Sequence, residues 1–161
     1  MAIQSGDPIP NATFTVMAPD GPQLRTTDQI FKGHKVVLFG VAGAFTPVCD
    51  KHHLPGFLDN LDQFKAQGVD EIAVTGVNDV FVMDAWAKSA GADGKITFLA
   101  DGNGDFARAI GLSLDLTARG LGIRSQRYAM IVDNGVVRKL NVEAAPGKVE
   151  ASSAEALLTQ L

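Results

Sequence analysis

The sequence predicts an α/β fold, with one mixed central sheet flanked by helices on both faces. Short apolar runs typical of buried strands alternate with helical patterns through the middle of the chain, and a hairpin pattern follows near the end. The chain has 161 residues and no internal repeat, linker or low-complexity segment. We therefore expect a single domain over residues 1–161.

The expected strands fall into three groups. Two short strands, within 13–17 and 24–27, are separated by a Gly-Pro turn and should form a hairpin at the edge of the sheet. Three buried runs follow, at 35–41, 71–77 and 96–100. Finally, 128–132 and 136–140 flank Asp133-Asn134-Gly135, and Asn-Gly is the strongest short hairpin pattern in the chain.

Helices are expected between the buried runs. The first follows Cys49, is interrupted at Pro55-Gly56 because proline lacks a backbone donor, and ends at Gly68. The second is capped by Asn78 or Asp79. Its apolar stripe is expected at Phe81, Val82, Ala85 and Trp86.

The last part of the chain carries weaker patterns. A short helix is expected over 105–110, and the glycine-broken segment 112–126 is expected to be a loop with some local order. Ser152 and Glu155 have the spacing of a capping box, so a closing helix should begin there.

Composition excludes several functions. A net charge of −4 argues against a general nucleic-acid partner, and no apolar stretch approaches the length of a membrane span. The chain has no P-loop or GxGxxG after a strand, so we expect no nucleotide cofactor. It has no CxxC, HExxH or EF-hand pattern, so we expect no metal site.

A cytoplasmic location is expected from two features. The first residues show no basic region followed by an apolar core, so no secretory signal is predicted. The chain has one cysteine, which rules out an internal disulfide and fits a reducing compartment.

That cysteine, Cys49, follows a buried strand and a glycine loop. Thr46 and Pro47 are typical of a helix start, with the hydroxyl as cap and proline in the first turn. The first turn presents unpaired N–H groups and the positive end of the helix dipole, which favour a nucleophilic thiolate. Alternatively, Cys49 is a small buried hydrophobe, as free cysteines often are.

Around Cys49 the sequence GAFTPVCDKHHLPGF resembles the active-site stretch of the peroxiredoxins, and HLPGF is similar to their type II (type V) group. The resemblance continues through DEIAVTGVND, FLADGNGDFARAIGLSLDL and GLGIRSQRYAMIVDNGVV, and covers essentially the whole chain in order. It implies a thioredoxin-like fold and reduction of peroxides by a cysteine.

The resemblance also implies roles for three residues. Cys49 matches the peroxidatic cysteine, Thr46 the hydroxyl residue three positions earlier, and Arg127 the active-site arginine. By themselves, Thr46 would be an ordinary helix cap and Arg127 an ordinary surface or ion-paired arginine. Arg124 is the second choice for the arginine, because it precedes Arg127 by three residues and could line the same pocket.

Two aromatic positions near Cys49 have expected structural roles. His53 matches the histidine of HLPGF and is expected to pack rather than act as a base. His52 and His53 are adjacent and do not share a helix face, which argues against a metal pair. Phe45 is expected to form an apolar wall of the pocket or of a dimer contact.

The chain departs from the family pattern in two respects. Where the family has a proline, seven residues before the cysteine, this chain has Ala42, so we expect a working but slower or more easily over-oxidised site. The positions of the family's second, resolving cysteine are occupied by Val74 and by the cysteine-free stretch 148–153. The resemblance therefore implies a one-cysteine form.

We expect an antioxidant enzyme that reduces hydrogen peroxide and alkyl hydroperoxides without a cofactor. An external thiol (glutathione, glutaredoxin or thioredoxin) would restore the cysteine, with glutathione and glutaredoxin preferred by analogy. The resemblance also implies a homodimer, through apolar residues near Phe45 and Leu121. Two alternatives remain: a peroxide sensor that signals through oxidised Cys49, and an inert thioredoxin-like scaffold.

Overall fold

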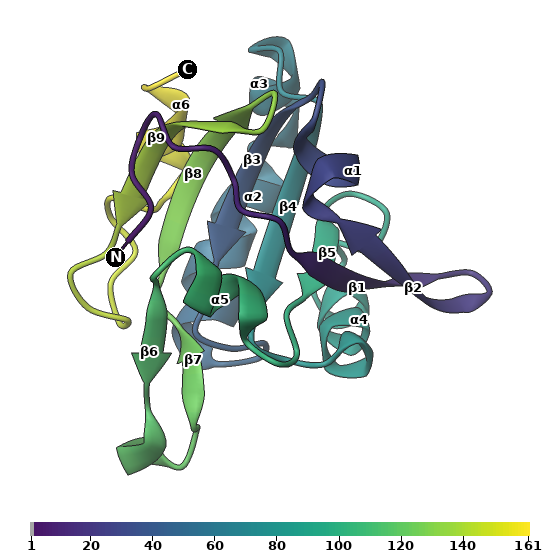
Figure 1. Cartoon of the computed structure of the whole chain (residues 1–161), viewed down its shortest axis with the longest axis vertical. Helices are drawn as coiled ribbons and strands as arrows, with labels where there is room; N and C mark the ends of the chain where they lie inside the picture. Colours follow the sequence, from purple (N-terminus) through teal and green to yellow (C-terminus); the bar gives the residue numbers. More distant parts are fainter. Residues whose placement is uncertain (1) are drawn as a thin grey trace.

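The computed structural model describes residues 2–161 and has a seven-stranded mixed sheet in the order β2-β1-β5-β4-β3-β8-β9 (Figure 1). The expected α/β class is confirmed. The strands of this sheet are β1 (Thr13–Ala18), β2 (Gly21–Thr26), β3 (Lys35–Gly40), β4 (Glu71–Gly76), β5 (Thr97–Ala100), β8 (Tyr128–Asp133) and β9 (Val136–Val142).

The centre of the sheet is parallel and its edges are antiparallel. β4 pairs in parallel with β3 and β5, and β1 and β8 join this core in antiparallel orientation. β3 is buried on both faces, which explains why Val36–Phe39 is an unbroken apolar run rather than an alternating one. The predicted N-terminal hairpin is β1–β2 at one edge, but its turn was placed wrongly. The turn is at Pro19-Asp20, and Gly21 and Pro22 are the first residues of β2.

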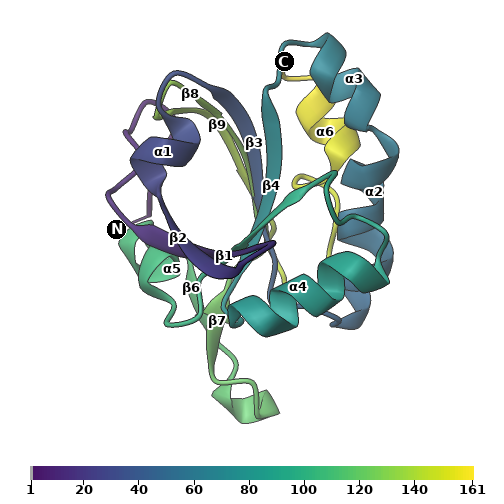
Figure 2. The same cartoon turned by 90° about the vertical axis from the view of Figure 1, so that its right-hand side faces the viewer.

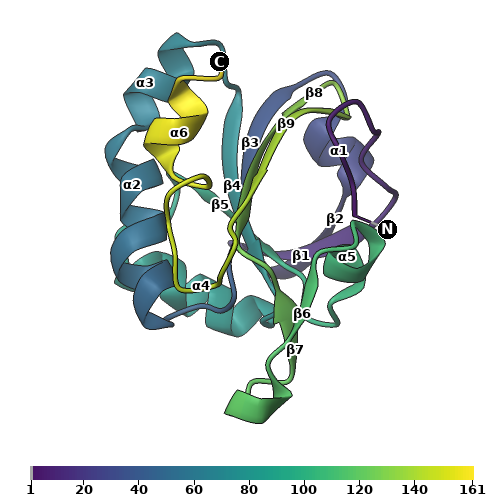
Figure 3. The same cartoon turned by 90° about the vertical axis from the view of Figure 1, so that its left-hand side faces the viewer.

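Helices cover both faces of the sheet, as expected (Figures 2 and 3). One face carries α1 (Thr27–Phe31) and α5 (Asp105–Ala109). The other face carries α2 (Leu54–Asp59), α3 (Leu61–Ala66), α4 (Val80–Ser89) and α6 (Ala154–Leu158). Each side encloses its own apolar cluster, and Cys49 belongs to the cluster beneath α2, α3, α4 and α6.

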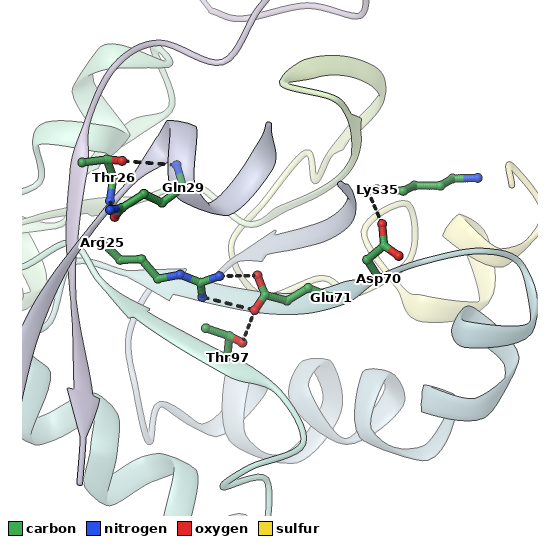
Figure 4. Close-up of polar contacts among 7 residues, drawn as sticks. All are labelled: Arg25, Thr26, Gln29, Lys35, Asp70, Glu71 and Thr97. Carbon is green, nitrogen blue, oxygen red and sulfur yellow. Dashed lines mark hydrogen bonds and ion pairs between the residues drawn. The ribbon is translucent and has the colours of Figure 1, made fainter. Parts of the chain in front are cut away.

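α1 and its surroundings were not expected from the sequence. The helix is short, but Thr26 and Gln29 form a capping box, each side chain bonding the other's backbone N–H (Figure 4). Nearby, the Arg25 guanidinium makes two 3.1 Å hydrogen bonds to the Glu71 carboxylate, which also accepts from the Thr97 hydroxyl. These contacts join β2 to β4 and β5.

The segment 112–126 is more regular than the loop with some local order that the sequence predicts. It contains an antiparallel hairpin, β6 (Ser113–Asp115) and β7 (Ile123–Ser125), which projects from the body of the molecule (Figures 1–3). Its strands have three residues each, too short for the alternating pattern that predicts a strand.

Of the apolar stripe predicted for α4, only Trp86 is buried, and the rest of the prediction was wrong. Asp79 caps the helix, accepting a hydrogen bond from the Val82 N–H. The buried face begins one residue earlier than expected, and Phe81 is 66% exposed. The buried positions are Val80, Met83, Trp86 and Ala87.

The end of the chain holds one confirmed and one corrected prediction. Asn134 and Gly135 join β8 to β9 and both have positive φ, 50° and 79°, as a type I′ turn requires. The cap of α6, however, is Ser153, whose hydroxyl accepts from the Ala156 N–H. Ser152 is buried and donates to Glu143 instead. None of the helices described is long and apolar enough to cross a membrane.

Gly40→Ala is expected to destabilise the protein by about 3 kcal/mol or more. A methyl group at Gly40 would lie 2.1 Å from a ring carbon of Tyr128, which is fully buried on the neighbouring strand and cannot move freely. Urea unfolding measures the change. Gly56→Ala is the matched control, because its nearest neighbour would be 3.9 Å away in a helix, where alanine is preferred. Equal stabilities for the two variants would contradict the prediction.

Candidate active site

Cys49 lies at the start of a helix, as the sequence predicts. The helical turn begins at Pro47, directly after Thr46, and Cys49 opens a π-helical turn, Cys49–His53, that continues into α2. The thiol is fully buried, packed against the sheet. Burial is also what an inert cysteine would show, so the neighbours of the sulfur decide its role.

The helix interruption predicted at Pro55-Gly56 was wrong, both in its position and in the type of irregularity. The helix runs through these residues to Asp59, and the chain breaks at Asn60, between α2 and α3. The Leu54 N–H bonds the Cys49 carbonyl five residues back, so the irregularity is the π-turn ahead of the proline. Pro55 lies in the first turn of α2, directly after the π-turn, and has no N–H to continue the helical hydrogen bonds.

Arg127 approaches Cys49 from the segment that leads into β8. Its Nη2 donates to Cys49 Sγ at 3.0 Å, and only 2% of the residue is exposed. A buried guanidinium keeps its charge at all relevant pH values, so the sulfur of Cys49 faces a fixed positive charge. The structure therefore brings together the two residues that the sequence selected from positions 78 apart.

His53 holds the other side of that guanidinium. Its Nδ1 lies 2.9 Å from Arg127 Nη1, and its Nε2 lies 3.0 Å from the Ser152 carbonyl oxygen. Since arginine only donates, Nδ1 must accept and Nε2 must carry the proton. Burial, followed by the charge of Arg127, lowers the pKa of His53 from 6.5 to about 3. The ring is therefore neutral, and it packs at a tilt against Phe39 and Phe57, as expected for a packing residue.

A loop after β9 completes the support of Arg127. The Pro146 carbonyl accepts from Arg127 Nε at 2.9 Å. The Glu143 carboxylate holds the loop by accepting from the Glu150 N–H and from both the N–H and the hydroxyl of Ser152. Although burial raises the pKa of Glu143, these hydrogen bonds outweigh it and lower the pKa overall. All three polar sides of the guanidinium are thus occupied.

Thr46 is placed as predicted, but its hydroxyl is not a helix cap. Thr46 Oγ1 donates to the Gly43 carbonyl at 2.7 Å, so its proton is already engaged and its lone pairs remain available as acceptors. The Ala44 N–H donates to Asn78 Oδ1 and ties the same loop to the end of β4. Phe45 lies in the left-handed region, φ 63°, and is 46% exposed.

Arg124 does not bond the thiol. Its Nε donates to the Leu121 carbonyl at 2.8 Å, and its Nη1 makes a 3.5 Å contact with the Ala42 carbonyl. The guanidinium packs against Gly43, where a methyl group would come within 2.7 Å of Nη1 and 3.2 Å of Thr46 Cγ2. Arg124 therefore lies over Gly43, next to Thr46, and makes no hydrogen bond to Cys49 within residues 2–161.

Comparison with known proteins places this arrangement in a family. The Redoxin family model matches residues 4–158. Peroxiredoxin-2E-2 of Oryza sativa is 45% identical over 164 residues, 99% of this chain and 72% of that protein. Peroxiredoxin-2C of Arabidopsis thaliana is 44% identical over 161 residues, covering 99% and 98%. The chain belongs to the peroxiredoxins. A crystal structure of reduced Prx3 from Vibrio vulnificus in complex with H₂O₂ is 49% identical, covers 98% of both chains and has a TM-score of 0.93.

Membership confirms the thioredoxin-like fold and the expected class of activity. The chain is a thiol-dependent peroxidase, and its single cysteine makes it a one-cysteine form. Among residues 2–161, no group of three or more His, Cys, Asp or Glu side chains is placed to hold a metal ion.

The supporting residues of this peroxiredoxin site could not be selected from sequence. Glu143, Pro146 and Ser152 lie 94 to 103 residues beyond Cys49 in a loop without a local pattern. The spacing of Ser152 to Glu155 instead predicts a helix cap. The pairing of His53 with Arg127 likewise depends on how β8 packs against the π-turn, which local patterns do not encode.

Ala42→Pro is expected to speed Cys49 oxidation severalfold and to stabilise the protein by roughly 0.4–1 kcal/mol. Proline would restrict the backbone just before Gly43, and the Ala42 N–H makes no backbone hydrogen bond within residues 2–161 that proline would remove. Peroxide reactivity and urea unfolding of the variant measure both effects. An unchanged oxidation rate would mean that Ala42 costs the peroxidase nothing.

Proposed function

We propose that Cys49 is the nucleophile, acting on hydrogen peroxide and small alkyl hydroperoxides. The observation that carries the proposal is the 3.0 Å hydrogen bond from Arg127 Nη2 to Cys49 Sγ. The thiolate attacks one peroxide oxygen, the O–O bond breaks and an S–O bond forms. The second oxygen leaves with the electron pair, takes up a proton and departs as water or an alcohol, while Cys49 becomes a sulfenic acid.

Thr46 and Arg127 have complementary roles in this proposal. Because the Thr46 hydroxyl already donates to Gly43, it accepts a hydrogen bond from the peroxide O–H. Arg127 and the N–H groups of the first helical turn stabilise the thiolate and the charge that develops on the leaving oxygen. His53, held neutral, keeps the guanidinium in place.

We propose that an external thiol returns Cys49 to the reduced state, with glutathione and glutaredoxin as the preferred pair and thioredoxin as the alternative. The support is the absence of a second cysteine in the sequence, so no internal disulfide can form. The proposed catalytic cycle therefore uses two external thiols per peroxide.

Stopped-flow measurement of thiol loss, with one equivalent of hydrogen peroxide, tests the first step. Loss within a second supports a preorganised site, whereas a free thiol under these conditions reacts over minutes or longer. Turnover with glutathione and glutaredoxin, compared with a thioredoxin system, tests the second step. Equal or faster turnover with thioredoxin would contradict the preferred reductant. No observation in residues 2–161 favours the sensor or the inert-scaffold alternative.

We propose a homodimer formed through the apolar residues near the site. Phe45 and Ile123 are 46% and 45% exposed, and Leu121 lies in the same hairpin region. Light scattering at micromolar concentration is expected to give twice the chain mass of 17.0 kDa; a species of 17.0 kDa would contradict it. A cytoplasmic location is also a proposal, supported by the lone cysteine and tested by cell fractionation.

A further inference from the structure

We infer that Arg124 is a recognition site for the carboxylate of an anionic thiol, so that the enzyme prefers carboxylate-bearing reductants over neutral ones of similar size. The inference deepens the proposed function and rests on it. It assigns a task to a charged side chain that the peroxide step does not use.

The position of Arg124 is suited to this task. It lies on β7 of the projecting hairpin, and its guanidinium packs on Gly43 beside Thr46, three residues before Cys49. The Leu121 carbonyl accepts from Nε at 2.8 Å, which fixes the direction of the side chain. No hydrogen bond within residues 2–161 uses Nη2. The guanidinium is therefore oriented and still has donors to offer.

No carboxylate within residues 2–161 balances the charge of Arg124. Its side chain is partly buried, yet no carboxylate in the described part of the chain lies within 4.0 Å of it. Arg25, which is also partly buried, is paired with Glu71, and Arg127 donates to the thiol sulfur. A partly desolvated cation without a counter-ion favours binding of an anion, and the guanidinium fork suits a carboxylate.

The reaction at this site takes place after the peroxide step. The thiol of the reductant attacks the sulfenic sulfur of Cys49, an S–S bond forms, and the hydroxyl leaves as water with the thiol proton. A second thiol then attacks the mixed disulfide, releasing a disulfide of the two reductant molecules and the Cys49 thiolate. Arg124 holds the carboxylate of the first thiol while its sulfur approaches Cys49.

The test compares two small thiols, 3-mercaptopropionate and 2-mercaptoethanol, which differ mainly in the carboxylate. Sulfenic Cys49, formed with one equivalent of hydrogen peroxide, is mixed with each thiol and its loss is followed. In Arg124→Met, the ratio of the rate constant for 3-mercaptopropionate to that for 2-mercaptoethanol is expected to fall roughly fivefold to tenfold. Arg124→Lys, which keeps the charge, should retain part of the ratio.

Arg119→Met is the matched control, because Arg119 is an exposed arginine in the same hairpin and its removal changes the net charge equally. Its ratio is expected to match that of the unmodified protein. Added salt should lower the ratio in the unmodified protein and much less in Arg124→Met. An unchanged ratio in Arg124→Met would overturn the inference.

The outcomes separate this inference from the proposed function. If Arg124 only clamps the Gly43 loop, its variants will slow the peroxide step and both thiols alike, and the ratio will not change; this too would overturn the inference. If Cys49 instead fails to react rapidly with peroxide in the unmodified protein, the proposed function fails first. A selective loss with the anionic thiol supports recognition by charge.

Discussion

Arg127→Ala is expected to slow the oxidation of Cys49 by hydrogen peroxide by roughly a hundredfold or more. The variant removes the donor 3.0 Å from Sγ, and with it the positive charge that favours the thiolate and the group proposed to stabilise the leaving oxygen. Stopped-flow thiol loss with one equivalent of peroxide measures the change.

Two further variants make this result interpretable. Arg127→Lys keeps the charge but cannot bond Sγ, His53 and Pro146 at once, so an intermediate rate is expected. Arg138→Ala removes an exposed arginine from β9 and should leave the rate unchanged. If Arg127→Ala folds, by circular dichroism, and still reacts within severalfold of the unmodified protein, Arg127 has no role in the peroxide step.

His53 is expected to make the protein lose stability as the pH falls. Its folded pKa is about 3, below the unfolded value of 6.5, because burial and the charge of Arg127 disfavour the protonated ring. Between these values the unfolded chain binds the proton and the folded chain does not, so the free energy of unfolding decreases as the pH decreases. The contribution present above pH 6.5, on the order of 5 kcal/mol, is lost by about pH 3.

Replacing the histidine tests this dependence. The free energy of unfolding of each protein is expressed relative to its own value at neutral pH. On that scale, His53→Asn should unfold at a lower pH than the unmodified protein. His52→Asn is the matched control, because His52 is the exposed neighbour and should not alter the acid transition. Identical pH dependences for His53→Asn and the unmodified protein would show that His53 is not held neutral by the fold.

Two different substitutions of His53 distinguish the roles of the ring's two hydrogen bonds. An asparagine can place an acceptor near Nδ1 and retain the contact with Arg127, whereas a glutamine can place a donor near Nε2 and retain the contact with Ser152. If the role of His53 is to orient Arg127, hydrogen peroxide should oxidise Cys49 roughly tenfold faster in His53→Asn than in His53→Gln.

Local sequence patterns were sufficient to predict an element where the residues of that short segment alone determine its conformation. The apolar run of β3 requires burial on both faces, and Asn134-Gly135 tolerates the positive φ values that a tight hairpin needs. They failed where neighbours decide: Phe81 is helical and apolar, but the contacts of α4 bury Val80 instead. Thr46 marks a helix start, yet its hydroxyl bonds Gly43 rather than the helix.

The sequence by itself determined the class of fold, the single cysteine at a helix start and, through family resemblance, the choice of Thr46 and Arg127. Only the tertiary structure decided how the arginine is held. Arg127, His53 and the loop around Pro146 come from distant parts of the chain, and their hydrogen bonds exist because β8, β9 and the π-turn pack against one another. Such contacts depend on the register and packing of whole elements, which no local pattern specifies.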